Sequence, residues 1–357
     1  MDPAVVTQLD PPKRFNRLKI AGVLLTLCGV ALFAYFVYRA GFHEIGEGVA
    51  RFGFAGFAVI LALYFLRLCV RSYAWVLSVF EHKGLRMRDA LPAVVIGEAL
   101  SAMLPLGILI SGTSKALAVR KRIPLVVAMS SVATENLFFS LTTGIFLVVG
   151  GIVALRVLAL DESLSLTIDA AIGIVVSLII FGIVAVIRQW HFASEACEWV
   201  YKKGYCKRVL ERGRMDVRLF ENLLYGFYRR YPRRFVPICL LEAAYHLIGI
   251  AEVWYILNRI TGENPSLVTS FLLESISRMI IVIFKLIPFV IGVDEAGAQF
   301  IGSFFALAAG VGLTLAIIRK GRVLFWTGIG IILIVKRGLT FKEITETSTR
   351  GFVNAER

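Results

Sequence analysis

Long apolar runs constrain the fold of this chain more than any other feature of its sequence. Residues 20–38, 54–80, 126–155 and 168–187 each meet or approach the roughly 20 residues that a membrane-spanning helix needs. The sequence is 58% hydrophobic and its mean hydropathy is +0.77, whereas soluble domains are closer to about half apolar. We therefore expect an all-α polytopic membrane protein rather than a soluble globular enzyme.

Two of the apolar segments are interrupted in the same way. The first reads GEALSAMLPLGILISGTSKALAVR and the second reads LESISRMIIVIFKLIPFVIGVDEAGAQF. In each segment an acidic residue (Glu98 or Glu274) precedes a proline (Pro105 or Pro288), and a short polar stretch and a second apolar helix follow. Paired, interrupted segments in corresponding halves are typical of transporters built from inverted repeats, which bind their substrate near mid-membrane.

These patterns predict about seven to nine helices, including two broken or re-entrant segments, and an inverted internal repeat. The expected continuous helices cover 20–38, 54–80, 124–155, 167–188, 235–257, 296–318 and 322–336, and the broken segments cover 90–112 and 266–291. Within one transmembrane domain at 20–337, we expect repeat one at about 54–188, a basic loop at 189–234 and repeat two at about 235–336. The ends are a cytoplasmic N-terminus at 1–19 and a polar tail at 338–357.

The distribution of basic residues predicts an orientation. The net charge is +14, and the stretch from Arg188 to Arg234 contains twelve Lys and Arg against five Asp and Glu. Because cytoplasmic loops are enriched in Lys and Arg, this loop is expected to be cytoplasmic, and an amphipathic surface helix fits 191–231. The loop either sets the topology alone or also holds anionic headgroups. The N-terminal apolar run is too long for a cleaved signal, so we interpret it as a first helix.

Loop charges favour a re-entrant interpretation of the first broken segment, because a full crossing would put Arg120–Arg122 outside. In the second half two alternatives stay open. If 266–291 is re-entrant, Arg319, Lys320 and Arg322 lie inside but Lys336 and Arg337 lie outside. If it spans the membrane, the C-terminus is cytoplasmic.

The two segments also carry a resemblance. Pro288, Gly292, Val293 and Glu295, followed by an apolar helix with Arg322 and Trp326, resemble one signature of the lysylphosphatidylglycerol-synthase transmembrane family, also called flippase-like. Leu104-Pro105, a small-residue stretch, the basic residues Lys115 and Arg120, and Ser131-x-x-x-Glu135 resemble its other signature. The resemblance covers about 20–337. It implies a protein that moves or handles polar lipids, as some relatives do beside hopanoid or glycolipid pathways.

The sequence departs from this family in two respects. The family's first signature often has Gly-Glu after the proline and then Arg, whereas this chain has Ser111-Gly112-Thr113-Ser114-Lys115. That difference leaves the headgroup preference open. Only about twenty residues follow Arg337, so the soluble aminoacyl-transferase domain of the synthases is expected to be absent and lysine transfer to lipid is not expected.

Glu135 is the leading candidate for a binding residue. It lies eleven residues past Pro124, about 15 Å along a helix and so near mid-membrane, where an ionisable residue indicates function. Ser131 and Asn136 lie beside it, although hydroxyl and amide groups also join membrane helices structurally. The further candidates for a lipid headgroup are Glu98, Ser111, Lys115, Glu274, Arg278, Asp294, Glu295 and Arg322.

Several candidates have a structural alternative. Glu274 and Arg278 are spaced for an ion pair within one helix, and Asp294 and Glu295 are placed to cap one. Lys115 also fits a cytoplasmic topology charge. Arg67 needs a carboxylate partner, for which Glu135 or Glu98 would serve, whereas Arg71 is expected to snorkel toward the interface. Glu242 and His246 form a weaker proton-relay candidate.

The remaining composition favours transport over other functions. The five cysteines and four histidines have no metal-ligand spacing, so we expect no metal, no cofactor and no catalytic constellation. The expected partners are polar or anionic membrane lipids and no nucleic acid, in a bacterial inner membrane. A homodimer or a partner enzyme of a lipid pathway is also compatible. A lipid-modifying enzyme and a non-catalytic scaffold stay open as alternative functions.

Overall fold

In the computed structural model the described residues are 38, 42–80, 84–104, 107–158, 161–203, 207–284, 287–305, 307 and 310–337. Nearly all of the predicted first helix, the N-terminus at 1–19 and the tail at 338–357 lie outside them, as do Pro105 and Lys285. The α-helices are α2 (Phe42–Leu77), α3 (Met87–Met103), α4 (Gly107–Ala118), α5 (Leu125–Val157), α6 (Glu162–Ile187), α7 (Phe192–Lys202), α8 (Lys207–Arg230), α9 (Phe235–Thr261), α10 (Leu267–Ile283), α11 (Val293–Phe304) and α12 (Val311–Lys336).

The prediction of an all-α polytopic membrane protein is confirmed. Within the described residues every regular element is helical, and four helical stretches are long and apolar enough to span a membrane: Gly46–Leu77, Leu125–Val157, Ser165–Ile187 and Pro232–Thr261. Helix α12 has 26 residues and is also long enough, about 39 Å, but it carries three cations in its middle.

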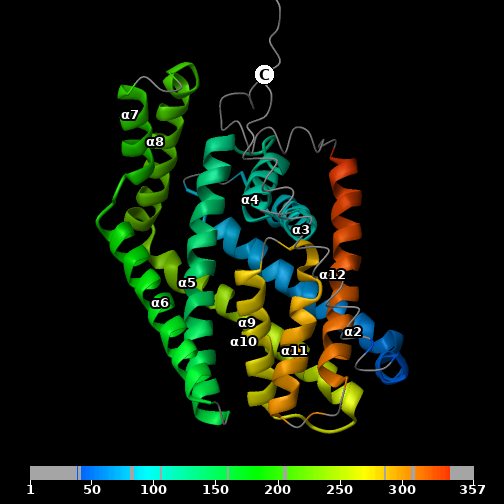
Figure 1. Ribbon diagram of the computed structural model, residues 1–357. Helices are drawn as coiled ribbons and strands as arrows, with labels where there is room; N and C mark the ends of the chain where they lie inside the picture. Colours follow the sequence, from blue (N-terminus) through cyan, green and yellow to red (C-terminus); the bar gives the residue numbers. More distant parts are fainter. Residues whose placement is uncertain are drawn as a thin grey trace, which may run out of the picture.

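Each predicted broken segment belongs to a helical hairpin, although the second arm of the second hairpin, α11, falls mostly in the predicted helix at 296–318. Helix α3 packs against α4, and α10 packs against α11. The paired helices match in length, with 17 residues in α3 and α10 and 12 residues in α4 and α11. Figure 1 shows the α3–α4 hairpin in the upper half of the bundle and the α10–α11 hairpin in the lower half. The two hairpins therefore enter the bundle from opposite ends.

Helix packing pairs the two halves reciprocally. The central contact joins α2 to α9, while α3 packs on α12 and α5 packs on α10. Small residues permit both outer contacts, since a Cβ added at Gly330 would lie 2.4 Å from Ala99 Cβ and one at Gly150 would lie 1.9 Å from Ser275 Oγ. Helices α2–α5 and α9–α12 thus form two matched sets, as an inverted repeat requires. Helices α6–α8 lie between these sets in the sequence.

The predicted division of the last apolar region into 296–318 and 322–336 is wrong. Helix α12 runs unbroken through Arg319–Arg322, and the break falls before it, at Gly310 with φ +84°. Arg337 at its far end donates to the carbonyl of Ala118 at 2.8 Å. The second hairpin and a C-terminal helix that ends beside α4 therefore occur together in one bundle.

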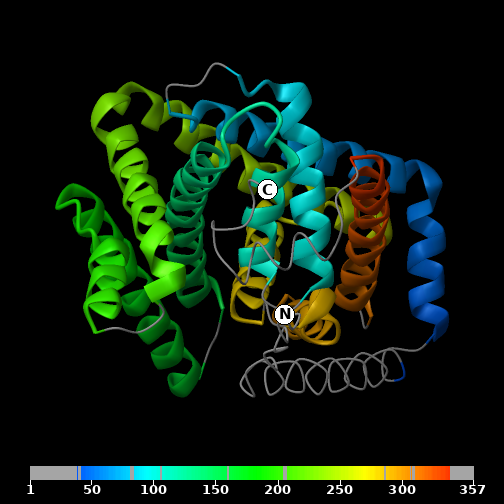
Figure 2. The same cartoon turned by 90° about the horizontal axis from the view of Figure 1, so that it is seen from above.

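The same end of the bundle collects further basic residues. Arg234 donates to the carbonyls of Leu77 and Val79 at 3.1 and 3.2 Å, and Arg122 pairs with Asp89 at 3.4 Å. The predicted amphipathic stretch at 191–231 is two helices, α7 and α8, which pack on each other. Figures 1 and 2 show them at the edge of the bundle beside α5 and α6.

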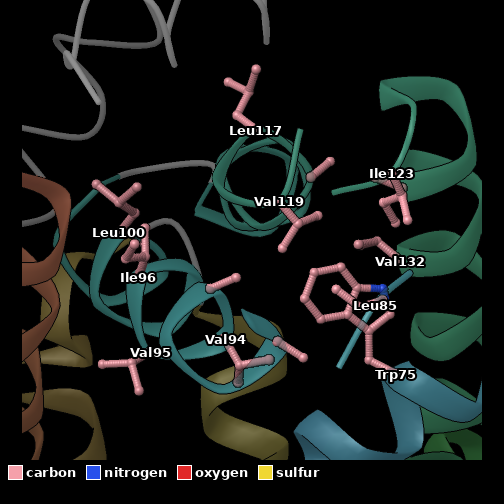
Figure 3. Packing of buried hydrophobic residues seen from close by; sticks show 14 of the residues in the cluster. Trp75, Leu85, Val94, Val95, Ile96, Leu100, Leu117, Val119, Ile123 and Val132 are labelled. Atoms are coloured by element: carbon pink, nitrogen blue, oxygen red, sulfur yellow. The ribbon is translucent and has the colours of Figure 1, made fainter. Parts of the chain in front are cut away.

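The first hairpin is held by the largest apolar cluster. Figure 3 shows side chains of α3 and α4, among them Ile96 and Leu117, gathered with Trp75 of α2 and Val132 of α5. The Trp75 indole N–H donates to Ser131 Oγ at 2.9 Å, so the one polar atom of that side chain is paired inside the cluster. This packing fixes where α3 and α4 present their polar residues.

Substitution of Gly330 tests the reciprocal packing. Gly330→Ala places a methyl group against Ala99 and the Val95 carbonyl, so we expect destabilisation of about 1–3 kcal/mol from overpacking. Gly328→Ala is the matched control, because an added Cβ there meets nothing within 4 Å. Thermal unfolding of the purified protein in detergent measures both, and equal midpoints for the two variants would argue against the α3–α12 contact.

Candidate functional site

A cavity of about 850 Å³ lies between the two matched sets; we call it the central cavity. Its volume is within the roughly 300–1,000 Å³ of small-molecule sites. Much of its wall is apolar, but charged side chains from α2, α3, α10, α11 and α12 line it too. They are the cations Arg67, Arg71, Arg278, Arg319, Lys320 and Arg322 and the carboxylates Glu98 and Asp294.

The first group of charges, the Arg71 cluster, forms around a residue of α2. Arg71 Nε donates to Glu135 Oε1 at 2.8 Å, Nη1 donates to Glu98, and Nη2 lies 3.4 Å from Asn136 Oδ1. Lys115 Nζ lies 3.7 Å from the other Glu135 oxygen. The expectation that Arg71 snorkels is wrong, since this residue brings four predicted site residues together.

Lys115 lies inside the bundle, with 1% of its surface exposed. Gly97 of α3 makes room for it, because an added Cβ would lie 2.8 Å from Lys115 Cγ and 2.9 Å from Ser111 Oγ. Ser111, one turn earlier on α4, lines the central cavity. This burial beside Glu135 does not fit the alternative of a cytoplasmic topology charge.

Ser131 has a structural contact instead of a place on the cavity wall. Its hydroxyl accepts from Trp75 and donates to the carbonyl of Ala128 at 2.8 Å. The residue is 1% exposed. Its role is therefore to position α5 against α2, one turn before Glu135.

The second group of charges, the Glu274 cluster, forms around a buried carboxylate of α10. Glu274 Oε1 accepts from Arg278 Nη2 at 2.7 Å and from Arg67 Nη2 at 3.2 Å, and Oε2 accepts from Arg319 Nη2 at 2.7 Å. Gly249 lets α9 approach, since a Cβ there would lie 2.5 Å from Glu274 Oε1. One carboxylate thus holds arginines from three helices.

Glu252 of α9 extends this cluster. It pairs with Arg67 Nη1 at 3.4 Å and with Arg322 of α12. The same two guanidinium groups lie over aromatic rings, Arg67 at 4.1 Å from the Tyr245 centroid and Arg322 at 4.2 Å from the Tyr64 centroid. Cation–π contact and ion pairing together stabilise charge in a water-poor interior.

Glu295 and Lys320 hold the tip of the second hairpin. Glu295 accepts from the amide of Gly292 at 2.7 Å and pairs with Lys320 Nζ at 3.2 Å. Lys320 Nζ also donates to the carbonyl of Phe289 at 2.6 Å. Phe289 and Val290 have φ of 54° and 49°, a region that non-glycine residues rarely adopt unless their surroundings hold them. Glu295 therefore makes the contacts expected of a residue that caps the start of α11, which was the structural alternative for this residue.

Several polar atoms at the central cavity have no hydrogen-bond partner within the described part of the chain. They include Nε of Arg67, Arg278 and Arg322 and Oδ1 of Asp294. All four residues line the central cavity, and Asp294 is 9% exposed. Buried polar groups are normally paired, so these atoms are unusual, and each of them is itself buried beneath the cavity surface.

Glu242 and His246 are both buried on α9, but no hydrogen bond joins them. Neither Glu242 oxygen has a hydrogen-bond partner among the described residues. His246 Nε2 contacts Thr143 Oγ1 at 3.1 Å, and its ring stacks between Phe139 and Phe146. His246 thus packs the interface of α5 and α9 with one ring nitrogen paired, whereas neither carboxylate oxygen of Glu242 is paired within the described residues.

Sequence reasoning missed part of the charged wall. Arg67 pairs with Glu252 and Glu274 rather than with the expected Glu135 or Glu98. Arg319 and Lys320 were expected in a cytoplasmic loop, but both are inside α12 and reach the hairpin. The first half of the chain could have predicted this placement. If the interval from the start of α3 to α5 is applied from residue 267, where α10 begins, these cations fall inside the last helix.

Comparison with known proteins gives the family. Residues 19–330 match the family described as the lysylphosphatidylglycerol synthase TM region. The chain belongs to this family. Comparison with curated proteins and with solved structures finds no match. Membership supports a lipid-related function for a multi-pass membrane protein, and the resemblance seen in the two signatures is confirmed.

Removing the Glu274 charge should destabilise the whole bundle. Glu274→Gln keeps the shape but leaves three buried arginines without their shared carboxylate, so we expect a loss of about 3–5 kcal/mol. Chemical denaturation in detergent measures it. Glu263→Gln, on the exposed turn after α9, is the control and should stay within about 0.5 kcal/mol of the parent protein. A Glu274→Gln variant with the same free energy of unfolding as the parent protein would contradict the assigned ion pairs.

Proposed function

We propose that this protein carries a polar lipid with an anionic headgroup across the membrane, with the headgroup in the central cavity. One observation carries the proposal: among the described residues, six cationic side chains but only two carboxylates line this cavity. The other carboxylates of the two clusters are buried behind that wall, Glu135, Glu252 and Glu274 each at 0% exposure. The charged residues that line the cavity therefore carry a net positive charge.

A phosphate group suits this wall. Arginine can grip phosphate with two parallel hydrogen bonds, whereas lysine acts as a point charge. The guanidinium groups of Arg67, Arg278 and Arg322 line the cavity and would donate hydrogen bonds to a phosphate bound there. In a site with little water such charge-assisted bonds are stronger than in bulk solvent. Glu98 and Asp294 would orient the hydroxyl or amine groups of a larger headgroup.

The two clusters support a path through the cavity. Arg67 and Arg71 lie one turn apart on α2, about 6 Å along its axis, and each belongs to a different cluster. A headgroup that leaves one arginine is thus within reach of the next. Rocking of the matched sets against each other, with the hairpins at opposite ends, would expose the site to each leaflet in turn.

The proposed orientation follows the basic residues. The end of the bundle that carries Arg122, Arg234, Arg337 and helices α7 and α8 faces the cytoplasm, in a bacterial inner membrane, with the N-terminus on that side. A phospholipid, a hopanoid or a glycolipid fits the family. Formation of a new lipid by the purified protein would favour a lipid-modifying enzyme instead, and function that survives loss of the cavity charges would favour a scaffold.

Exchange of lipid between leaflets tests the proposal. Arg278→Gln removes one cavity cation, and we expect exchange of labelled phosphatidylglycerol in proteoliposomes to fall about tenfold or more, the worth of a charge-assisted hydrogen bond. Exchange by Arg278→Lys should be intermediate between the parent and Arg278→Gln, because lysine keeps the positive charge but lacks the planar guanidinium that donates two parallel hydrogen bonds. Arg259→Gln, exposed near the end of α9, is the control. Equal exchange in all variants, each shown to be folded, would refute the proposed site.

We also propose that Glu242 binds a proton during the cycle. Its carboxylate is fully buried with no hydrogen-bond partner among the described residues, and Glu135, Arg71, Lys115 and Glu98 are the charged groups that act on it. An isolated buried carboxylate is costly when ionised. An anionic headgroup on Arg71 would add a second negative charge nearby, which would disfavour ionised Glu242 and so couple proton binding to headgroup binding.

The pH dependence of exchange tests this role. We expect exchange by the parent protein to rise as pH falls, because protonation of Glu242 then accompanies headgroup binding. Glu242→Gln mimics the neutral acid and should remove the dependence. His246→Gln should retain it, because no hydrogen bond joins the two residues. Loss of the dependence in His246→Gln with retention in Glu242→Gln would support the histidine as the titrating group and overturn this assignment.

A further inference from the structure

The central cavity has an apolar arm along one helix, α6. Seven residues of α6 line it, and they recur at intervals of three and four, so that they form one stripe on one face of the helix. The stripe consists of Val175, Leu178, Ile179, Gly182, Ile183, Val186 and Ile187. Leucines of α5 and the α10 residues Ile281 and Val282 complete this arm, which is continuous with the cationic wall.

Helix α6 is the most hydrophobic of the candidate membrane spans and the least buried by the rest of the protein. The span Ser165–Ile187 has the highest mean hydropathy of the four candidate spans, 3.0, and no part of it is buried within the protein. It packs on α5, where Gly144 contacts Ile179 and Gly151 contacts Ile172. Figure 1 shows α6 diverging from α5 beyond these contacts, toward the end where α7 begins.

We propose that this stripe, the α6 stripe, binds an acyl chain of the lipid whose headgroup occupies the cationic wall. From Val175 to Ile187 it is about 18 Å long, comparable with the roughly 15 Å of hydrocarbon in one leaflet. The inference rests on the proposed function and adds where the acyl chain of the lipid lies. It also assigns the leaflet, because the stripe ends where α7 begins, at the basic end of the bundle.

The continuity of the two surfaces selects the occupant. A single amphiphile with an anionic head and an apolar tail matches a cavity that is cationic along α10 and α12 and apolar along α6. A helix of a second copy would cover the stripe but would leave the cationic side chains of the cavity wall without an anion. A free anion would pair with those cations but would leave the stripe without a partner.

Two glycines of α6 provide a matched pair of variants. Gly182 lies on the stripe, whereas Gly173 lies nine residues earlier, about half a turn away around the helix. A Cβ added at either position meets nothing within 4 Å, so neither substitution clashes at its first side-chain atom. Gly182→Trp therefore fills the arm, and Gly173→Trp places the same side chain on the opposite face.

The test uses the full chain in proteoliposomes with phosphatidylglycerol that carries a diazirine in its acyl chain. We expect photolabelling within 175–187 in the parent protein and in Gly173→Trp, and about tenfold less in Gly182→Trp, because the indole displaces methylenes from an apolar site. Exchange of long-chain phosphatidylglycerol should fall in parallel. Binding of a short-chain, water-soluble phosphatidylglycerol should be unchanged in both variants.

The outcomes separate this inference from the proposed function. Labelling of the stripe that responds to Gly182→Trp, in a protein that exchanges no lipid, would support the acyl site and refute transport. Exchange that depends on Arg278 but is insensitive to Gly182→Trp, with no label on α6, would keep transport and overturn the acyl site. A parent protein that is a dimer in detergent and becomes a monomer in Gly182→Trp would assign the stripe to a second copy and also overturn it.

Discussion

The fold depends on the neutralisation of buried charge. An ionised side chain inside a membrane is costly unless it is paired, and this bundle buries a carboxylate, Glu274, that three arginines share. Those arginines come from α2, α10 and α12, so one carboxylate fixes the relative positions of three helices. Hydrophobic burial alone discriminates poorly between partner helices in a bilayer, because lipid tails are as apolar as leucine. The ion pairs therefore specify which helices meet, and the small residues Gly249, Gly150 and Gly330 let them approach closely enough to do so.

Helix α2 joins the two halves electrostatically. Arg71 pairs within its own matched set, with Glu98 and Glu135, whereas Arg67 pairs with Glu252 and Glu274 of the other set. Movement of either hairpin therefore changes the ion pairs of one of these two arginines. Because the two arginines are one helical turn apart, the change occurs next to the other cluster. This coupling needs no flexible linker. It requires only that α2 stays rigid while carboxylates on the hairpins move past it, which fits a rocking motion of inverted halves.

Hydropathy and charge bias were enough to predict the helical membrane fold, both broken segments and the basic end of the bundle, since these are properties of contiguous residues. The pairings were not predictable in the same way. Arg71 and Glu135 are 64 residues apart, and Arg67 and Glu274 are 207 apart, so no local spacing joins them. The same difficulty explains the misplaced helix break. Arg319, Lys320 and Arg322 resemble a loop when read alone, and only their partners on α9, α10 and α11 make an unbroken α12 acceptable inside the bundle.

The layered arrangement of charge also bears on turnover. A cavity lined by cations alone would hold an anionic headgroup tightly, because breaking those contacts would leave bare charges in a medium of low dielectric constant. Here all five arginines that line the cavity, Arg67, Arg71, Arg278, Arg319 and Arg322, have a buried carboxylate partner behind the wall. Departure of the headgroup then costs hydrogen bonds rather than the neutralisation of a charge. Binding that is favourable but reversible is what a carrier needs, whereas a storage site or a structural lipid site would gain from the opposite arrangement. The carboxylates buried behind the arginines are therefore as much a part of the proposed transport site as the arginines that face the lipid.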